Sequence, residues 1–164
     1  MNMRIVNREG RGPMTTSRRT ADILIQSPEG NPIAVVEVKN IPNLTRNEAI
    51  QLRRNLADYG VPFQMPFFLL LSQDIGFLWK DSKYENLDSQ PTYEFPMDRV
   101  VARYSSREPG ERMYEAEFVF LVLRWLNNLA TKQQNIGEEP EKSLAILGFI
   151  EAVRGADVLL EAEL

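Results

Sequence analysis

The chain has 164 residues, of which 43% are hydrophobic and 26% are charged, a composition typical of a single soluble globular domain. It contains no cysteine and no histidine, which excludes disulfides, thiolate metal sites, zinc–histidine sites and histidine general bases. Any metal ion would have to bind oxygen ligands, and such ligands favour Mg²⁺ or Mn²⁺.

The charge is distributed unevenly along the chain. The whole sequence has a net charge of −4, but residues 1–20 hold five arginines and one glutamate, a local net charge of +4. This basic N-terminal arm either contacts phosphates or is simply a solvated terminus. The first residues lack the apolar core of a signal peptide, and no apolar run is long enough to span a bilayer. We therefore expect a cytoplasmic protein without membrane contact.

Two strands begin the regular part of the chain. Ala21–Gln26 is rich in Ile and Leu, and Ile33–Lys39 is dominated by β-branched residues. The segment between them, Ser27–Pro32, is dense in turn formers, so the three segments predict a β-hairpin. The pair Thr45 and Glu48 then has the spacing of a capping box, which predicts the start of a helix.

The next segments predict two further strands and a long connection. Phe67–Ser72 is apolar on both faces, as in a strand that is covered on each side, and Ile75–Lys80 should return beside it. The order strand, helix, strand predicts a right-handed βαβ unit, and we expect the 67–80 hairpin at the sheet edge. Asp81–Gly110 contains three prolines and is expected to close over a substrate or to wrap the core.

The C-terminal part is expected to be mainly helical. Glu111–Lys132 has a broad apolar stripe, which indicates a helix that either covers the sheet or forms a subunit interface. Glu141–Val153 is expected to be a second helix, whereas Asp157–Glu163 fits a helical turn or a short strand equally well. These elements predict an α/β fold in a single domain over residues 1–164.

Three side chains of the first hairpin form a candidate catalytic site: Asp22, Glu37 and Lys39. Glu37 and Lys39 are two residues apart, so they share one face of their strand. Carboxylate oxygens bind Mg²⁺, which retains waters and binds substrate phosphate. The ion lowers the pKa of a bound water, and a nearby lysine can orient the nucleophile. The trio therefore predicts phosphodiester hydrolysis. The alternative is an ordinary surface ion pair with Lys39.

Four arginines are candidates for contacts with nucleic-acid phosphates. Arg18 and Arg19 lie in the basic arm, and Arg53 and Arg54 lie on the polar face of the expected first helix. For the helical pair, a plain solvated face is the alternative interpretation.

The sequence also resembles a known family. The run Ala21-Asp22-Ile-Leu-Ile, the hairpin turn, the run Ala34-Val-Val-Glu37-Val-Lys39, the amphipathic helix and the strand pair 67–80 resemble the PD-(D/E)XK nuclease superfamily and its uncharacterised bacterial members. The resemblance covers about residues 20–80. It implies a restriction-endonuclease-like mixed central sheet flanked by helices, with the element order α-β-β-β-α-β and, here, additional C-terminal helices.

The resemblance also implies roles for individual residues. Asp22 and Glu37 would bind a metal together with the backbone carbonyl of Val38, and Lys39 would complete the catalytic set. The cofactor would be Mg²⁺ or Mn²⁺. The substrate would be a nucleic acid, DNA rather than RNA.

The chain departs from the family pattern in two places. Ala21 stands where the family usually has proline. Only some twenty residues precede Asp22, so the usual first helix with its glutamate is short, missing or replaced by a later helix such as Glu111–Lys132. In that last case, Glu115 or Glu117 would stand near the site.

On this interpretation the chain divides into a basic arm (1–20), a nuclease-like core (21–80), a long connection (81–110) and a helical C-terminal part (111–164). The expected function is Mg²⁺-dependent hydrolysis of phosphodiester bonds, in DNA. The alternative is a catalytically inactive module of the same fold that binds nucleic acid or protein. A homodimer through the 111–132 helix is compatible with either function.

Overall fold

A computed structural model describes residues 21–108, 110–132 and 135–160 of the chain. Its strands are β1 (Ile23–Gln26), β2 (Pro32–Val38), β3 (Met65–Leu71), β4 (Ile75–Ser82), β5 (Tyr93–Pro96) and β6 (Asp157–Leu160). Its helices are α1 (Arg46–Asp58), α2 (Asp98–Tyr104), α3 (Glu115–Thr131), α4 (Glu141–Ile146) and α5 (Phe149–Val153), and the 3-10 turn η2 lies at Tyr84–Asn86.

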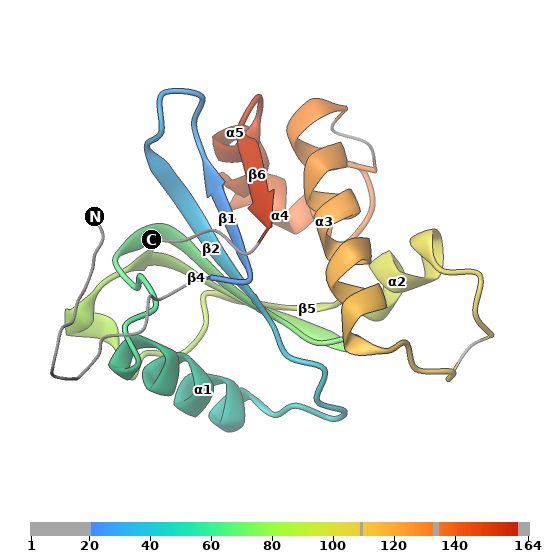
Figure 1. Cartoon of the computed structure of the whole chain (residues 1–164), viewed down its shortest axis with the longest axis horizontal. Coiled ribbons are helices and arrows are strands. Elements are labelled where there is room, and N and C mark those ends of the chain that lie inside the picture. Colours follow the sequence, from blue (N-terminus) through green and yellow to red (C-terminus); the bar gives the residue numbers. More distant parts are fainter. Residues whose placement is uncertain (1–20, 109, 133–134, 161–164) are drawn as a thin grey trace, which may run out of the picture.

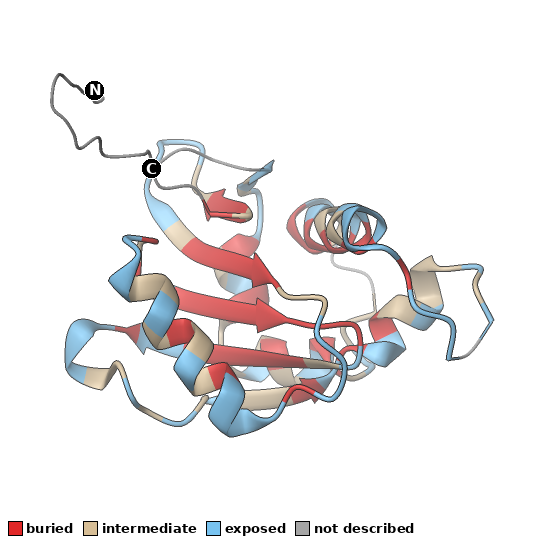
Figure 2. Ribbon diagram, turned by 60° about the horizontal axis from the view of Figure 1, so that its bottom comes forward, coloured by how far each residue is buried: buried red, intermediate tan, exposed pale blue. Residues whose placement is uncertain are grey.

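The strands of this part of the chain form one mixed sheet with the order β5-β4-β3-β2-β1-β6. Helix α1 packs on one face of the sheet, and α3, α4 and α5 pack on the other (Figure 1). Most strand residues are buried, because both faces are covered (Figure 2). The general α/β class expected from the sequence is confirmed.

Strands β1 and β2 form the predicted antiparallel hairpin, with Ile23 opposite Val36 and Leu24 opposite Val35. Alternate residues of each strand pack into two different hydrophobic cores, one on each face of the sheet. Ile23 and Val36 pack under α3 to α5, whereas Leu24 and Val35 pack under α1. The register therefore decides which face each following polar side chain occupies.

Helix α1 begins where the sequence predicts. The Glu48 N–H donates to Thr45 Oγ1 (3.2 Å), and the Thr45 N–H donates to Glu48 Oε1 (2.9 Å), which completes a capping box. After the helix, Gly60 adopts a φ of 91°, a left-handed conformation that favours glycine. The chain then returns as β3, parallel to β2, so the predicted strand–helix–strand unit is present.

The β3–β4 hairpin lies inside the sheet, so its expected edge position was wrong. Strand β5 pairs with the outer side of β4, and the connection that follows β4 supplies this extra strand. The packing at the new pair is close. A Cβ on Gly76 would lie 2.4 Å from the Phe95 ring, so any larger residue would have to displace that ring.

The C-terminal part is divided into shorter elements than the sequence predicts. The expected helix 141–153 is two short helices, α4 and α5, because Gly148 takes a φ of 89° between them. The segment 157–160, which fitted a turn or a strand, is strand β6 and pairs antiparallel with β1. Thus the last described element lies beside the first.

Helix α3 covers the sheet, which was one of its two expected roles. Its inner stripe is buried, including Phe118, Trp125 and Leu129. Its outer side keeps Phe120 59% exposed, and the preceding Tyr114 is 79% exposed. None of the helices in the described ranges combines the length and apolar composition that crossing a bilayer requires.

Candidate active site

Asp22 and Glu37 face each other across the first hairpin. The register that pairs Ile23 with Val36 places Asp22 opposite Glu37. The Asp22 N–H donates to Glu37 Oε2 (2.7 Å), and the Val38 N–H donates to Asp22 Oδ2 (2.8 Å). Each carboxylate is thus fixed by a backbone amide of the other strand, and the two groups lie side by side at the end of β2.

The two carboxylates disturb each other electrostatically. Glu37 is only 3% exposed, while Asp22 is half-buried. Burial, with repulsion from Asp22 as the second cause, raises the pKa of Glu37 to about 7 from its ordinary value of 4.5. The Asp22 amide and the Lys39 charge oppose this rise only in part. A cation between the carboxylates would relieve the repulsion.

Lys39 lies where the strand pattern predicts. It follows β2 on the face that carries Glu37, and its N–H donates to the Leu71 carbonyl (2.8 Å), which extends the pairing with β3. Its side chain is half-buried, and its charge lowers the pKa of Glu37. The structure therefore brings all three candidate catalytic residues to one end of the β1–β2 pair.

The donor set suits a hard divalent cation with an incomplete protein shell. Within the described part of the chain, Asp22 Oδ1 and Glu37 Oε1 receive no hydrogen bond, so each carboxylate keeps one oxygen for a metal. Mg²⁺ is often held by one or two carboxylates, with waters and substrate phosphate as its remaining ligands. No group of three or more acidic residues that could hold a metal occurs among residues 21–108, 110–132 and 135–160.

A third carboxylate from α3 does not join the pair. Glu37 lies on the α1 face, whereas α3 packs on the opposite face of the sheet (Figure 1). Glu117 is also engaged elsewhere, because its carboxylate accepts two hydrogen bonds from Arg107 Nη2 (2.7 and 2.8 Å). Glu117 is thus paired with Arg107, and the expectation that Glu115 or Glu117 stands near the site stays a prediction.

Arg53 was wrongly expected to contact nucleic acid. It is fully buried on the α1 face, where its guanidinium lies 4.3 Å from the Phe63 ring centroid. Arg53 Nη2 donates to Ser82 Oγ (2.8 Å), and Arg53 Nη1 donates to the carbonyl of Asn86 (3.0 Å). Burial lowers the pKa of Arg53 to about 10. The side chain fastens the segment after β4 onto α1, and it cannot reach an external phosphate.

For the other three candidate arginines, contact with nucleic-acid phosphates stays a prediction. The Arg54 side chain is 42% exposed, and its Nη1 atom donates to both carboxylate oxygens of Asp88 (2.5 and 2.7 Å), so a phosphate would have to compete with Asp88. Arg18 and Arg19 lie outside the described residues.

A polar network that the sequence did not predict lies beyond the ends of β2 and β3. Gln73 Oε1 accepts from the Met113 N–H (3.0 Å), and Gln73 Nε2 donates to the Met113 carbonyl (3.0 Å), as a paired strand would. Asn40 Nδ2 donates to the same carbonyl (3.2 Å), and Arg112 Nη2 donates to Asn40 Oδ1 (3.1 Å). Polar residues directly after two parallel strands were the available signal. The network ties the start of α3 to the residue after Lys39.

Comparisons with known proteins do not assign the chain to a family. No family model matches the chain, and no curated protein or solved structure is detectably similar to it. The functional argument therefore depends on the arrangement of the residues themselves.

Proposed function

We propose that the protein is a Mg²⁺-dependent nuclease that hydrolyses phosphodiester bonds, in DNA. The observation that carries this proposal is the reciprocal pairing of Asp22 and Glu37 across the β1–β2 hairpin, with Lys39 next along the same strand face. In this proposal Asp22 and Glu37 bind the metal. Lys39 orients the attacking water or neutralises charge at phosphorus.

The sheet order supports the resemblance to PD-(D/E)XK nucleases. That resemblance implies a strand before β1; among the described residues, β6 pairs antiparallel with β1 and occupies the place beside it. The neighbouring elements β1, β2, α1 and β3 then follow in the implied order, with β2 and β3 parallel. The restriction-endonuclease-like fold is thus proposed with one strand supplied from the C-terminal part.

The raised pKa of Glu37 is consistent with a metal site. A carboxylate that holds a proton near neutral pH must release it to bind Mg²⁺, so metal binding should strengthen as pH rises through about 7. The Val38 carbonyl stays a proposed third ligand. The Val38 N–H already donates to Asp22, which fixes this peptide next to the carboxylates.

The test is cleavage of plasmid DNA with Mg²⁺, with Mn²⁺ and with EDTA. We expect cleavage only with a metal, and its loss in Lys39→Ala at unchanged stability. Lys80→Ala is a matched control, because Lys80 is an exposed lysine on β4, and β3 separates this strand from β2. Equal cleavage by the wild type and Lys39→Ala would refute the proposed role of this site.

The burial of Glu37 favours a second candidate, a module of the same fold that binds nucleic acid or protein without turnover. A carboxyl that is 3% exposed leaves little room for a hydrated ion. Calorimetry distinguishes the two candidates. Heat from Mg²⁺ binding that disappears in Glu37→Gln supports the nuclease, whereas DNA binding without any metal uptake supports the binding module. A homodimer through α3 is compatible with both, and light scattering tests it.

A further inference from the structure

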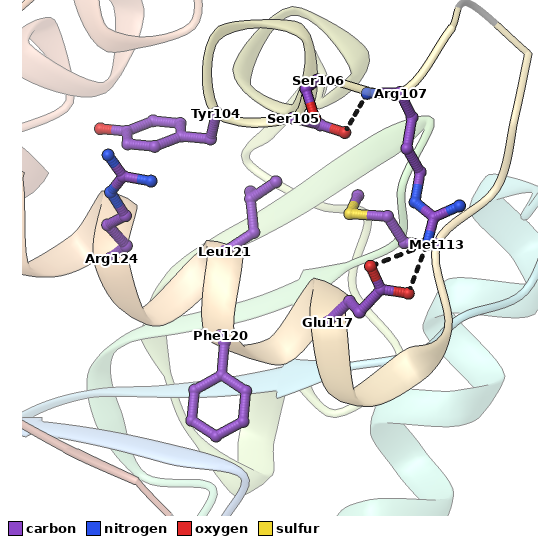
Figure 3. A pocket seen from close by; sticks show the side chains of 9 residues that line it. All are labelled: Tyr104, Ser105, Ser106, Arg107, Met113, Glu117, Phe120, Leu121 and Arg124. Atoms are coloured by element: carbon purple, nitrogen blue, oxygen red, sulfur yellow. Dashed lines mark hydrogen bonds and ion pairs between the residues drawn. The ribbon is translucent and has the colours of Figure 1, made fainter.

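A cavity of about 410 Å³ lies between α2 and α3, away from the carboxylates. Figure 3 shows its lining. One wall comes from the end of α2 and the segment after it, with Tyr104, Ser106 and Arg107, and the other comes from α3, with Leu121 and Arg124. The lining therefore combines guanidinium groups, hydroxyls, an aromatic ring and the Glu117 carboxylate over an apolar floor.

Arg124 is the cation in this cavity that is available to a ligand. Its guanidinium carbon lies 5.2 Å from the centroid of the Tyr104 ring, and it forms no ion pair with a carboxylate in the described part of the chain. Arg107, in contrast, is held by Glu117. The Tyr104 hydroxyl accepts a hydrogen bond from Asn128 Nδ2 (2.7 Å), which fixes the ring beneath Arg124. A guanidinium that stacks on an aromatic ring and is not paired with a carboxylate suits a phosphate.

The cavity is linked to the candidate active site by direct contacts. Met113 lines the cavity, and its carbonyl accepts the hydrogen bond from Asn40, the residue after Lys39. From Glu117 to Arg124 the cavity follows two turns of α3, about 10 Å. The carboxylates lie on the α1 face and the cavity lies on the α3 face, so a strand that contacts both would pass around the end of β2 at Asn40.

We propose that the α2–α3 cavity binds a phosphate of the same nucleic-acid strand whose phosphodiester lies at Asp22 and Glu37, with Arg124 as the contact residue. The proposal rests on the proposed nuclease function, since it names a second contact for that substrate. Tyr104 is a positioning residue, because it acts by holding the Arg124 guanidinium in place.

Binding of a short fluorescein-labelled single-stranded DNA, measured by anisotropy in EDTA, tests the proposal without cleavage. We expect Arg124→Gln to weaken binding about tenfold, as expected for loss of a charged hydrogen bond. The slope of log K against log salt should fall in magnitude by about 0.7, the value for one contact to a single strand. Lys132→Gln is the matched control, an exposed cation at the other end of the same helix that should change neither quantity.

The outcomes separate this proposal from the nuclease itself. Cleavage that depends on Lys39, together with unchanged DNA affinity and salt slope in Arg124→Gln, would refute the cavity and leave the nuclease standing. Arg124-dependent DNA binding without any metal-dependent cleavage would refute the nuclease and support the cavity. Binding of an acidic peptide in place of DNA, with the same dependence on Arg124, would overturn the assignment to nucleic acid.

Discussion

The carboxyl group of Glu37 should make the stability of the fold depend on pH. Its pKa is about 7 in the folded protein and about 4.5 in an unfolded chain, where neither burial nor Asp22 acts on it. Between these values the folded protein keeps a proton that the unfolded chain releases. The free energy of unfolding should therefore fall as pH rises through this window, and Glu37→Gln should remove the effect.

The size of the effect follows from the two pKa values. Each pH unit of difference contributes about 1.4 kcal/mol, so the loss between pH 4.5 and about 7 amounts to about 3 kcal/mol. For a domain of this length, that is about 6–12 °C in Tm. Glutamine keeps an oxygen that can accept the Asp22 N–H, so Glu37→Gln should fold and should exceed the wild type in stability at pH 8.

Urea unfolding at pH 5 and pH 8, in EDTA, measures the effect. Glu29→Gln is the matched control, because Glu29 is an exposed glutamate in the turn of the same hairpin and its substitution changes the net charge equally. If the wild type and Glu37→Gln lose the same free energy of unfolding between the two pH values, Glu37 is not the buried, proton-holding group described above. Mg²⁺ at pH 8 should restore stability to the wild type and not to Glu37→Gln, since a ligand stabilises only a fold that binds it.

Two further predictions concern the packing around the sheet. Arg53→Met should lower the free energy of unfolding by about 3 kcal/mol or more, because it leaves buried acceptors of the segment after β4 without a donor. The neighbouring Arg54→Met removes only an exposed ion pair and should lower it by less than about 1 kcal/mol; similar losses in both variants, by urea unfolding, would contradict the burial of Arg53. Gly76→Ala should lower it by about 3 kcal/mol, because the new Cβ would overlap the Phe95 ring. Gly137→Ala meets no atom within 4 Å and should be nearly neutral; a Gly76→Ala protein with the Tm of the wild type would show that β5 does not pack there.

The sequence predicts the arrangement of the three candidate residues, because they are close together in the chain. Asp22, Glu37 and Lys39 belong to one hairpin, and the alternation of apolar residues in a hairpin fixes which side chains face each other. The capping box of α1 is local in the same way. Such features depend on residues within about 15 positions of one another in the chain.

The features that the sequence did not predict correctly depend on contacts between segments that are far apart in the chain. Arg53 follows Ala49 by four residues, so it lies on the buried side of α1, but its charge favoured a polar surface; only the fold shows that the segment from Ser82 to Leu87 covers it. Likewise β5 and β6 are short strands that become recognisable only through β4 and β1, their partners. The break at Gly148 was visible as a glycine, yet an amphipathic pattern runs through it, and the pattern favoured one helix.

The pairing of β6 with β1 has a consequence for synthesis of the chain. β1 leaves the ribosome long before β6, and at about 5–20 residues per second several seconds pass before its partner is made. During this interval the strand next to Asp22 presents unpaired N–H and C=O groups, which can recruit a strand from another chain. The hairpin that carries the acidic pair therefore has an unpaired edge during synthesis, and its partner strand β6 is among the last of the described residues.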